Sequence, residues 1–243
     1  MSDVLVKRDG AILEITLNRP DDGNAMSDDA AAELTRLLLN TDDGTDAIVL
    51  RGAGADFCIG RATMGRPRDG APPEALARRR STEVIFDCYG AFRRSAVPIV
   101  GVVQGRALGF GCALAALCDV TLASEDATFA IPEMSHNTFP TMVMSALVDR
   151  VPLKALTYLV YSTAVISAER ALTFGIVSDV VTPSALEGAV ATLRGRLAKT
   201  PKPALCAVKE YARSAFDMGT AGAVDFARNL HATINSSSEM RRS

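Results

Sequence analysis

The chain has 243 residues, of which 48% are hydrophobic and 22% charged, so its length and composition suit one globular domain or one domain with an appendage. Its formal net charge of -2 argues against the strongly basic surface of a protein that binds nucleic acid or an anionic membrane. Two histidines and five cysteines, with no Cys-x-x-Cys, argue against a Cys/His metal site and a disulfide framework.

The N-terminal quarter predicts a strand, a turn, a helix and a second strand. Residues 12–17 alternate between apolar and polar side chains as a half-buried strand does, and residues 21–24 are typical of a turn. Ser27 is the expected N-cap of a helix, because it precedes two aspartates and an apolar stripe that ends near Asn40. A short buried strand is then expected at residues 48–50.

The middle of the chain predicts strands and helices around a glycine-rich turn. Residues 61–82, rich in arginine, proline and glycine, read as a loop that enters a helix near Pro73-Glu74. The β-branched run 97–103 predicts a buried strand, the glycines of 105–111 predict a tight turn, and a helix is expected after it. That helix spans residues 112–118, and further strands are expected at 120–122, 128–130 and 176–181.

The last quarter is helical in its pattern. Helices are expected at residues 186–198, 203–216 and 221–234. The fold class is therefore α/β, with a core over residues 1–183 and a C-terminal helical region over residues 184–243.

Two strand ends carry glycines that loosen the backbone and expose its amides. The turn 105–111 opens a helix, whose first N–H groups lack internal partners and can bind a developing oxyanion. The segment 54–61 also follows a strand and ends beside Gly60. Each segment alone is equally explained by tight packing, but the pair predicts two N–H groups directed at one oxygen.

A nucleotide-binding turn is a rival interpretation of Gly105-x-x-x-Gly109-x-Gly111. Three features argue against it. The turn lies in mid-chain, no acidic residue ends a following strand at the distance expected for a ribose contact, and no Tyr-x-x-x-Lys follows.

Seven segments match the motifs of one known family in order and spacing: Leu17-Asn18-Arg19-Pro20, Asn24-Ala25-Met26, Phe57-Cys58-Ile59-Gly60, residues 97–112, Cys118-Asp119-Val120, residues 129–133 and residues 171–177. From about residue 4 to residue 217 the chain thereby resembles the crotonase family of enoyl-CoA hydratases and isomerases. The resemblance implies a crotonase spiral of ββα units with a C-terminal helical trimerisation region, and assembly as a homotrimer or hexamer.

The resemblance also implies a reaction on an acyl-CoA thioester, with coenzyme A as part of the substrate and no metal or other cofactor. The main-chain N–H groups of Arg61 and Phe110 would hold the enolate oxygen, and Glu133 would move the proton. The substrate-binding positions implied are Asn24, Ala25, Ile59, Gly60, Arg61, Ala62, Thr63, Met64, Gly109, Phe110, Ala113, Pro132, His136 and Thr141.

The sequence departs from the family at the second catalytic acid. Hydratases of the family use two glutamates, and Ala113 stands where the first is expected. A single carboxyl favours isomerase-like proton shuttling, in which one base removes a proton and returns it at another carbon. Hydration by Glu133 with another water-holding group, and acyl-CoA binding without catalysis, remain as alternatives.

Four other positions also depart from the family or bear on the site. Ala62 replaces an aspartate, Gln104 an asparagine and Phe110 a glycine, and Thr141 stands where some relatives place an aspartate. A basic stretch near the first loop is explained by a solvated helix face or by attraction to coenzyme A phosphates. It comprises Arg66, Arg68, Arg78, Arg79, Arg80, Arg93 and Arg94.

The sequence shows no basic region followed by an apolar run near its start and no apolar stretch of about 18 residues. A cytoplasmic protein that binds neither nucleic acid nor a membrane is therefore expected.

Overall fold

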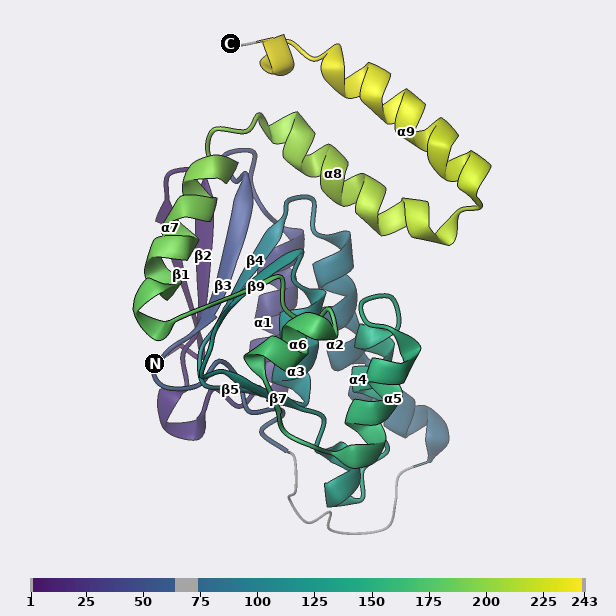
Figure 1. Cartoon of the computed structure of the whole chain (residues 1–243). Helices are drawn as coiled ribbons and strands as arrows, with labels where there is room; N and C mark the ends of the chain where they lie inside the picture. The colour runs from purple at the N-terminus through teal and green to yellow at the C-terminus, as the bar shows by residue number, and fades with distance from the viewer. Residues whose placement is uncertain (1, 64–73, 242–243) are drawn as a thin grey trace.

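A six-stranded sheet forms the centre of the molecule in the computed structural model, which describes residues 2–63 and 74–241 (Figure 1). The strands lie in the order β1-β2-β3-β4-β6-β9; β1 and β2 are antiparallel and every other pair is parallel. Their bounds are β1 Val4–Asp9, β2 Ile12–Leu17, β3 Ala47–Gly52, β4 Ile99–Val103, β6 Val120–Ser124 and β9 Asp179–Val181.

A smaller sheet has the order β5-β7-β8 and lies below the C-terminal ends of the central strands in the view of Figure 1. It comprises β5 Arg106–Leu108, β7 Thr128–Ala130 and β8 Ile166–Ser167. Because β5 follows β4 after two residues, the chain passes directly from the large sheet into the small one.

Helices cover both faces of the large sheet. Side chains of β3 alternate between two hydrophobic clusters: Ile48 and Leu50 join the main core, and Ala47 and Val49 face the opposite cluster, which contains residues of α7. The helices are α1 Asp28–Leu39, α2 Ala75–Arg94, α3 Phe110–Leu117, α4 Thr141–Leu147, α5 Leu153–Ser162, α6 Ala168–Thr173, α7 Leu186–Leu197, α8 Lys202–Ser214 and α9 Thr220–Asn235.

The C-terminal helices divide into two groups by their packing. Leu186 and Val190 of α7 are buried against the sheet, whereas α8 and α9 run side by side apart from it in Figure 1. Only Leu205 and Lys209 of α8 are buried, and α9 has no buried residue. The proposed division at residue 184 therefore falls before a helix that packs on the core.

Most of the expected elements are present, including the Ser27 N-cap, whose Oγ accepts a hydrogen bond from Ala30 N at 3.1 Å. The expected helix after the glycine turn begins two residues earlier, at Phe110, and the turn itself contains β5. No strand was expected for β1, an edge strand in which Val4 alone is buried. The sequence analysis assigned no element to α4, α5, α6 or β8 either.

Among the residues described, no helix combines the length and apolar character that crossing a membrane requires.

Candidate active site

Two segments that lie 49 residues apart in the chain pair side by side at the ends of β3 and β4. Cys58 and Ala107 form a parallel bridge, in which Cys58 N donates to Arg106 O at 3.1 Å and Leu108 N donates to Cys58 O at 2.9 Å. Arg61 and Phe110 each follow their bridge residue by three positions, so the shared register brings them to matching places. The two loops singled out in the sequence therefore lie side by side, and the convergence of their N–H groups on one oxygen stays a prediction.

Glycines make this close approach possible. Gly60 has φ of 118°, a conformation that favours glycine, although a Cβ there would meet Leu108 O at an ordinary 3.5 Å; a Cβ added to Gly111 would lie 2.0 Å from Cys58 O. The second distance is far below any real contact, so only glycine fits where the start of α3 packs on the neighbouring loop.

The N–H groups of Arg61 and Phe110 make no main-chain hydrogen bond to any described residue. Arg61 is held by its neighbours, since Met26 N donates to Gly60 O at 2.8 Å and Ala62 N donates to Met26 O at 2.9 Å. Phe110 is the first residue of α3, where an N–H has no partner within the helix. Within residues 2–63 and 74–241, no acceptor receives either N–H. Both are available to a ligand oxygen.

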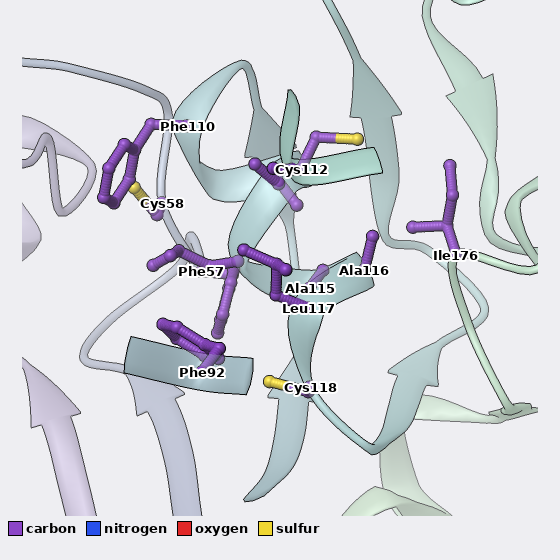
Figure 2. Packing of buried hydrophobic residues seen from close by; sticks show 14 of the residues in the cluster. Phe57, Cys58, Phe92, Phe110, Cys112, Ala115, Ala116, Leu117, Cys118 and Ile176 are labelled. Atoms are coloured by element: carbon purple, nitrogen blue, oxygen red, sulfur yellow. The ribbon is translucent and has the colours of Figure 1, made fainter. Parts of the chain in front are cut away.

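The side chain of Phe110 is buried in the core. It is 1% exposed, stacks on Tyr89 with 5.2 Å between ring centroids, and lies beside Cys58 in the buried cluster of Figure 2. The aromatic ring at this position, where the sequence resemblance led us to expect glycine, is thus part of the hydrophobic core.

Glu133 begins a short 3-10 helix (Glu133–His136) directly after β7, and its carboxyl group lies against Gly109. A Cβ on Gly109 would be 2.6 Å from Glu133 Oε1, and Gly109 N donates to Ala130 O at 2.9 Å. Gly109 also has φ of 51° and ψ of -111°, a conformation that side chains oppose. The acid thus sits one residue away from the Phe110 N–H.

The surroundings of the Glu133 carboxyl favour its protonated, uncharged form. The residue is 4% exposed, and no described residue donates a hydrogen bond to its buried Oε2. Burial raises its pKa from 4.5 to about 7. Burial likewise raises the pKa of Tyr89 well above its usual value, with smaller contributions from Cys88 and Glu133. A carboxyl group with a pKa near neutrality can both accept and return a proton.

A hollow of about 460 Å³ lies beside the first loop. Four of the expected substrate-binding residues line it: Ala25, Ile59, Arg61 and Ala62. The other lining residues are Arg19, Asp21, Asp22, Gly23 and Arg106. Each arginine in this lining is paired with a carboxylate, Arg19 with Asp22, Arg61 with Asp28 and Arg106 with Asp56.

Asn24 has a structural position instead of an open one. It is buried with φ of 56°, its Oδ1 accepts from Arg19 N, and its Nδ2 donates to Ala53 O and Asp56 O. Its side chain thereby fixes the turn before α1 to the loop after β3.

The remaining expected positions differ in their exposure. Ala113 is fully buried one turn into α3, and Pro132 is half-buried at the start of the 3-10 helix. His136, Thr141 and Thr63 are exposed. Met64, Arg66 and Arg68 lie outside the described residues, and so does most of the expected loop 61–82 before Glu74, the N-cap of α2. Of the other arginines, Arg93 is paired with Asp149, and Arg78, Arg79 and Arg80 are exposed on α2.

Three contacts of the site were not predicted from the sequence. The Gly109–Glu133 contact, the Tyr89–Phe110 stack and the Arg61–Asp28 pair each join residues that are distant in the chain. The sequence indicated only that the two glycine loops lie at neighbouring strand ends, and this does not specify which side chains are in contact.

Comparisons with known proteins agree along nearly the whole chain. A family model described as enoyl-CoA hydratase/isomerase matches residues 7–243. (E)-Benzylidenesuccinyl-CoA hydratase of Thauera aromatica is 30% identical over 210 residues, which cover 84% of this chain and 79% of the relative.

Two solved structures extend the similarity to the fold. Enoyl-CoA hydratase of Mycobacterium smegmatis gives a TM-score of 0.91 at 26% identity, over 98% of this chain and 93% of that chain. A Thermobifida fusca YX protein, solved in complex with acetoacetyl-CoA, gives a TM-score of 0.83 at 27% identity, over 95% and 94% of the two chains. The architecture is therefore shared from the sheet to the C-terminal helices.

Proposed function

This chain belongs to the enoyl-CoA hydratase/isomerase family, whose members are enzymes with the crotonase fold, and we propose that it shifts the double bond of an enoyl-CoA thioester. The observation that carries this proposal is the Glu133 carboxyl. It is buried, its pKa is raised to about 7, it rests on Gly109, and Ala113 supplies no second acid beside it.

The reaction begins with Glu133 as a base. Its carboxylate takes a proton from C2 of a 3-enoyl-CoA, and the electrons of that C–H bond move toward the thioester carbonyl to give an enolate. The N–H groups of Arg61 and Phe110 donate to the enolate oxygen, and each such donor typically contributes about 3 kcal/mol to a transition state. Glu133 then returns its proton to C4, which leaves the double bond between C2 and C3.

This assignment requires no metal and no redox partner, because one group carries the proton both ways. Coenzyme A is part of the substrate, and the hollow lined by Ala25, Ile59 and Ala62 beside Arg61 supports its binding next to the oxyanion site. The T. fusca structure with acetoacetyl-CoA supports the same class of ligand.

Glu133→Gln tests the proposal, since it keeps the shape of the side chain and removes the base. We expect isomerisation of 3-enoyl-CoA to fall by at least about a thousandfold, with binding of a saturated acyl-CoA nearly unchanged. Isomerisation that survives the substitution would refute the role of Glu133. Binding without turnover for every chain length tried would favour a non-catalytic acyl-CoA binder.

Hydration of 2-enoyl-CoA is the second candidate, and the name of the T. aromatica relative favours it. It requires a water held by some group other than residue 113, because alanine has no polar side-chain atom. Product analysis of wild type separates the two candidates: a 3-hydroxyacyl-CoA formed faster than the shifted enoyl-CoA would favour hydration.

The helical region after residue 184 is proposed to join copies of the chain into a trimer or hexamer. Helices α8 and α9 enclose an apolar hollow of about 490 Å³, lined among others by Val208, Phe216, Leu230 and Ile234. Such a surface on a protruding helical pair supports association with another copy.

A further inference from the structure

Arg61, whose N–H is the proposed oxyanion donor, is also held through its side chain, which pairs with Asp28. Arg61 Nη2 donates to Asp28 Oδ1 at 2.5 Å, and Asp28 is the first residue of α1. The main chain around Arg61 is held by Met26, two residues before Asp28 in the chain. The segment 26–28 therefore holds Arg61 at two points, one on the backbone and one at the end of the side chain.

Helix α1, which carries Asp28, is firmly packed in the core. Helix α1 buries Ala30, Ala31, Leu34, Leu37 and Leu38 in the main core, and Ser27 caps its first turn. Asp28 is therefore fixed with respect to the sheet that carries both glycine loops. The guanidinium reaches it from a side chain that is only 18% exposed, with Nε buried.

The backbone just before Arg61 is held by hydrogen bonds and not by side-chain sterics. Gly60 has φ of 118° and no side chain, so the direction of the Arg61 N–H depends on the bonds that Gly60 O and Ala62 N make with Met26. An oxyanion donor is effective only when it is held within about 0.5 Å and 10–20° of its working geometry. The pair between Arg61 and Asp28 adds a side-chain restraint to the main-chain bonds with Met26.

We propose that Asp28 is a positioning residue, which aims the Arg61 N–H at the enolate oxygen by holding the Arg61 side chain. The inference rests on the proposed function, because it needs Arg61 to be an oxyanion donor. The competing explanation is an ordinary surface ion pair, since the Asp28 side chain is 52% exposed and such pairs contribute only about 0–1 kcal/mol to stability.

Asp29 provides a matched control. It follows Asp28 in the first turn of α1, is exposed, and makes no ion pair with any described residue. Asp28→Asn and Asp29→Asn therefore remove the same charge from the same helix end, and only the first removes the contact with Arg61. Arg61→Met provides a second route, because it deletes the side chain and keeps the N–H.

We expect Asp28→Asn to lower kcat by roughly tenfold, a fraction of what full loss of an oxyanion donor causes, with KM changed less than about twofold. Arg61→Met and the double variant should show the same loss, because both residues act through one contact. Asp28→Glu should recover part of the rate, and Asp29→Asn should match wild type. Thermal unfolding midpoints of the Asn variants should agree.

A spectroscopic measurement distinguishes a misdirected Arg61 N–H from a general loss of folded structure. Acetoacetyl-CoA absorbs in the near ultraviolet as its enolate, so the enolate fraction of the bound ligand reports directly on the oxyanion donors. Asp28→Asn should lower that fraction and Asp29→Asn should not. Equal behaviour of the two variants, while Glu133→Gln still abolishes turnover, would overturn the positioning role alone. An activity indifferent to Glu133→Gln would overturn the proposed function and this inference with it.

Discussion

At the scale of single residues, the carboxyl group of Glu133 is buried and therefore largely shielded from water. Its carboxyl is buried against Gly109, and the resulting pKa of about 7 makes the protonated and ionised forms comparable near neutral pH. A group that must take and return a proton in one cycle benefits from this balance. The same burial has consequences for rate and for stability, and each can be measured.

The rate consequence is a dependence on pH governed by one ionisation. Because the proposed base is the carboxylate, kcat/KM should rise about tenfold per pH unit below pH 7 and level off above it. At pH 5 the value should be about one hundredth of the plateau. A profile of isomerisation between pH 5 and 9 checks this, and a flat profile over that range would contradict the assignment.

The stability consequence has the opposite sign. The folded-state pKa of Glu133 lies above its ordinary value of 4.5, so its contribution to stability is present below pH 4.5 and is lost as the pH rises through 7. A shift of this size corresponds to about 3 kcal/mol. Relative to Glu133→Gln, wild type should therefore lose on the order of 3 kcal/mol of unfolding free energy between pH 4.5 and pH 8.

Urea unfolding at several pH values measures this difference, and other ionisable groups cancel between the two proteins. Glu125→Gln, at an exposed position, is the matched control and should show no such divergence from wild type. Parallel curves for wild type and Glu133→Gln would mean that the carboxyl is not buried in solution.

At the scale of elements, the two glycine loops were predictable and the contacts that complete them were not. The glycines at 105–111 and at Gly60 announce sharp backbone turns, and the strands before them place both turns at one end of a parallel sheet. Strand β5 was missed because its three residues carry no period, and β1 was missed because an edge strand with one buried residue shows no alternation. The Arg61–Asp28 pair depends on how two distant segments pack, which no local pattern encodes.

A partly buried ion pair helps to attach the helical pair formed by α8 and α9 to the core. Lys209 Nζ donates to Asp119 Oδ2 at 2.6 Å, and the same oxygen accepts a hydrogen bond from Ile99 N at 2.7 Å. Lys209 is 5% exposed, and Leu205 is the only other buried residue of α8. The ion pair thus links a weakly packed helix to the start of β4.

Lys209→Met should loosen this attachment, because it leaves Asp119 without its cation. Removing one partner of a fully buried pair costs roughly 3 kcal/mol, and we expect a smaller loss here because the Asp119 side chain is 22% exposed. We expect faster proteolytic cleavage between α7 and α8 and a lower urea midpoint, measured against Lys199→Met, which alters an exposed lysine nearby. If both variants resist protease and urea like wild type, α8 is held chiefly by other contacts.

At the scale of the whole molecule, the proposed active site and the α8–α9 pair lie at opposite ends of the central strands. The glycine loops follow the C-terminal ends of β3 and β4, whereas Lys209 meets Asp119 and Ile99, where β6 and β4 begin. The apolar surface of α8 and α9 is thus remote from the acid of its own chain. The sequence resemblance predicted helices suited to assembly, and their placement relative to the site required the structure.

Assembly should depend on the apolar side chains of this pair. Phe216 is 88% exposed, far more than a side chain of its size favours in an isolated chain. We expect sedimentation of wild type as a trimer or hexamer and a shift toward smaller species in Phe216→Asp. Asn229→Asp adds the same charge at an exposed polar position of α9 and should leave the sedimentation unchanged. A wild-type monomer at micromolar concentration would contradict the proposal.

The main-chain N–H of Phe110 can be tested apart from the fold by replacing its nitrogen with oxygen. No described group accepts that hydrogen, so the native structure loses no internal bond if the amide nitrogen becomes an ester oxygen. A semisynthetic chain carrying phenyllactic acid in place of Phe110 would keep the aromatic ring stacked on Tyr89. Such a backbone ester should melt like the natural protein and turn over substrate far more slowly.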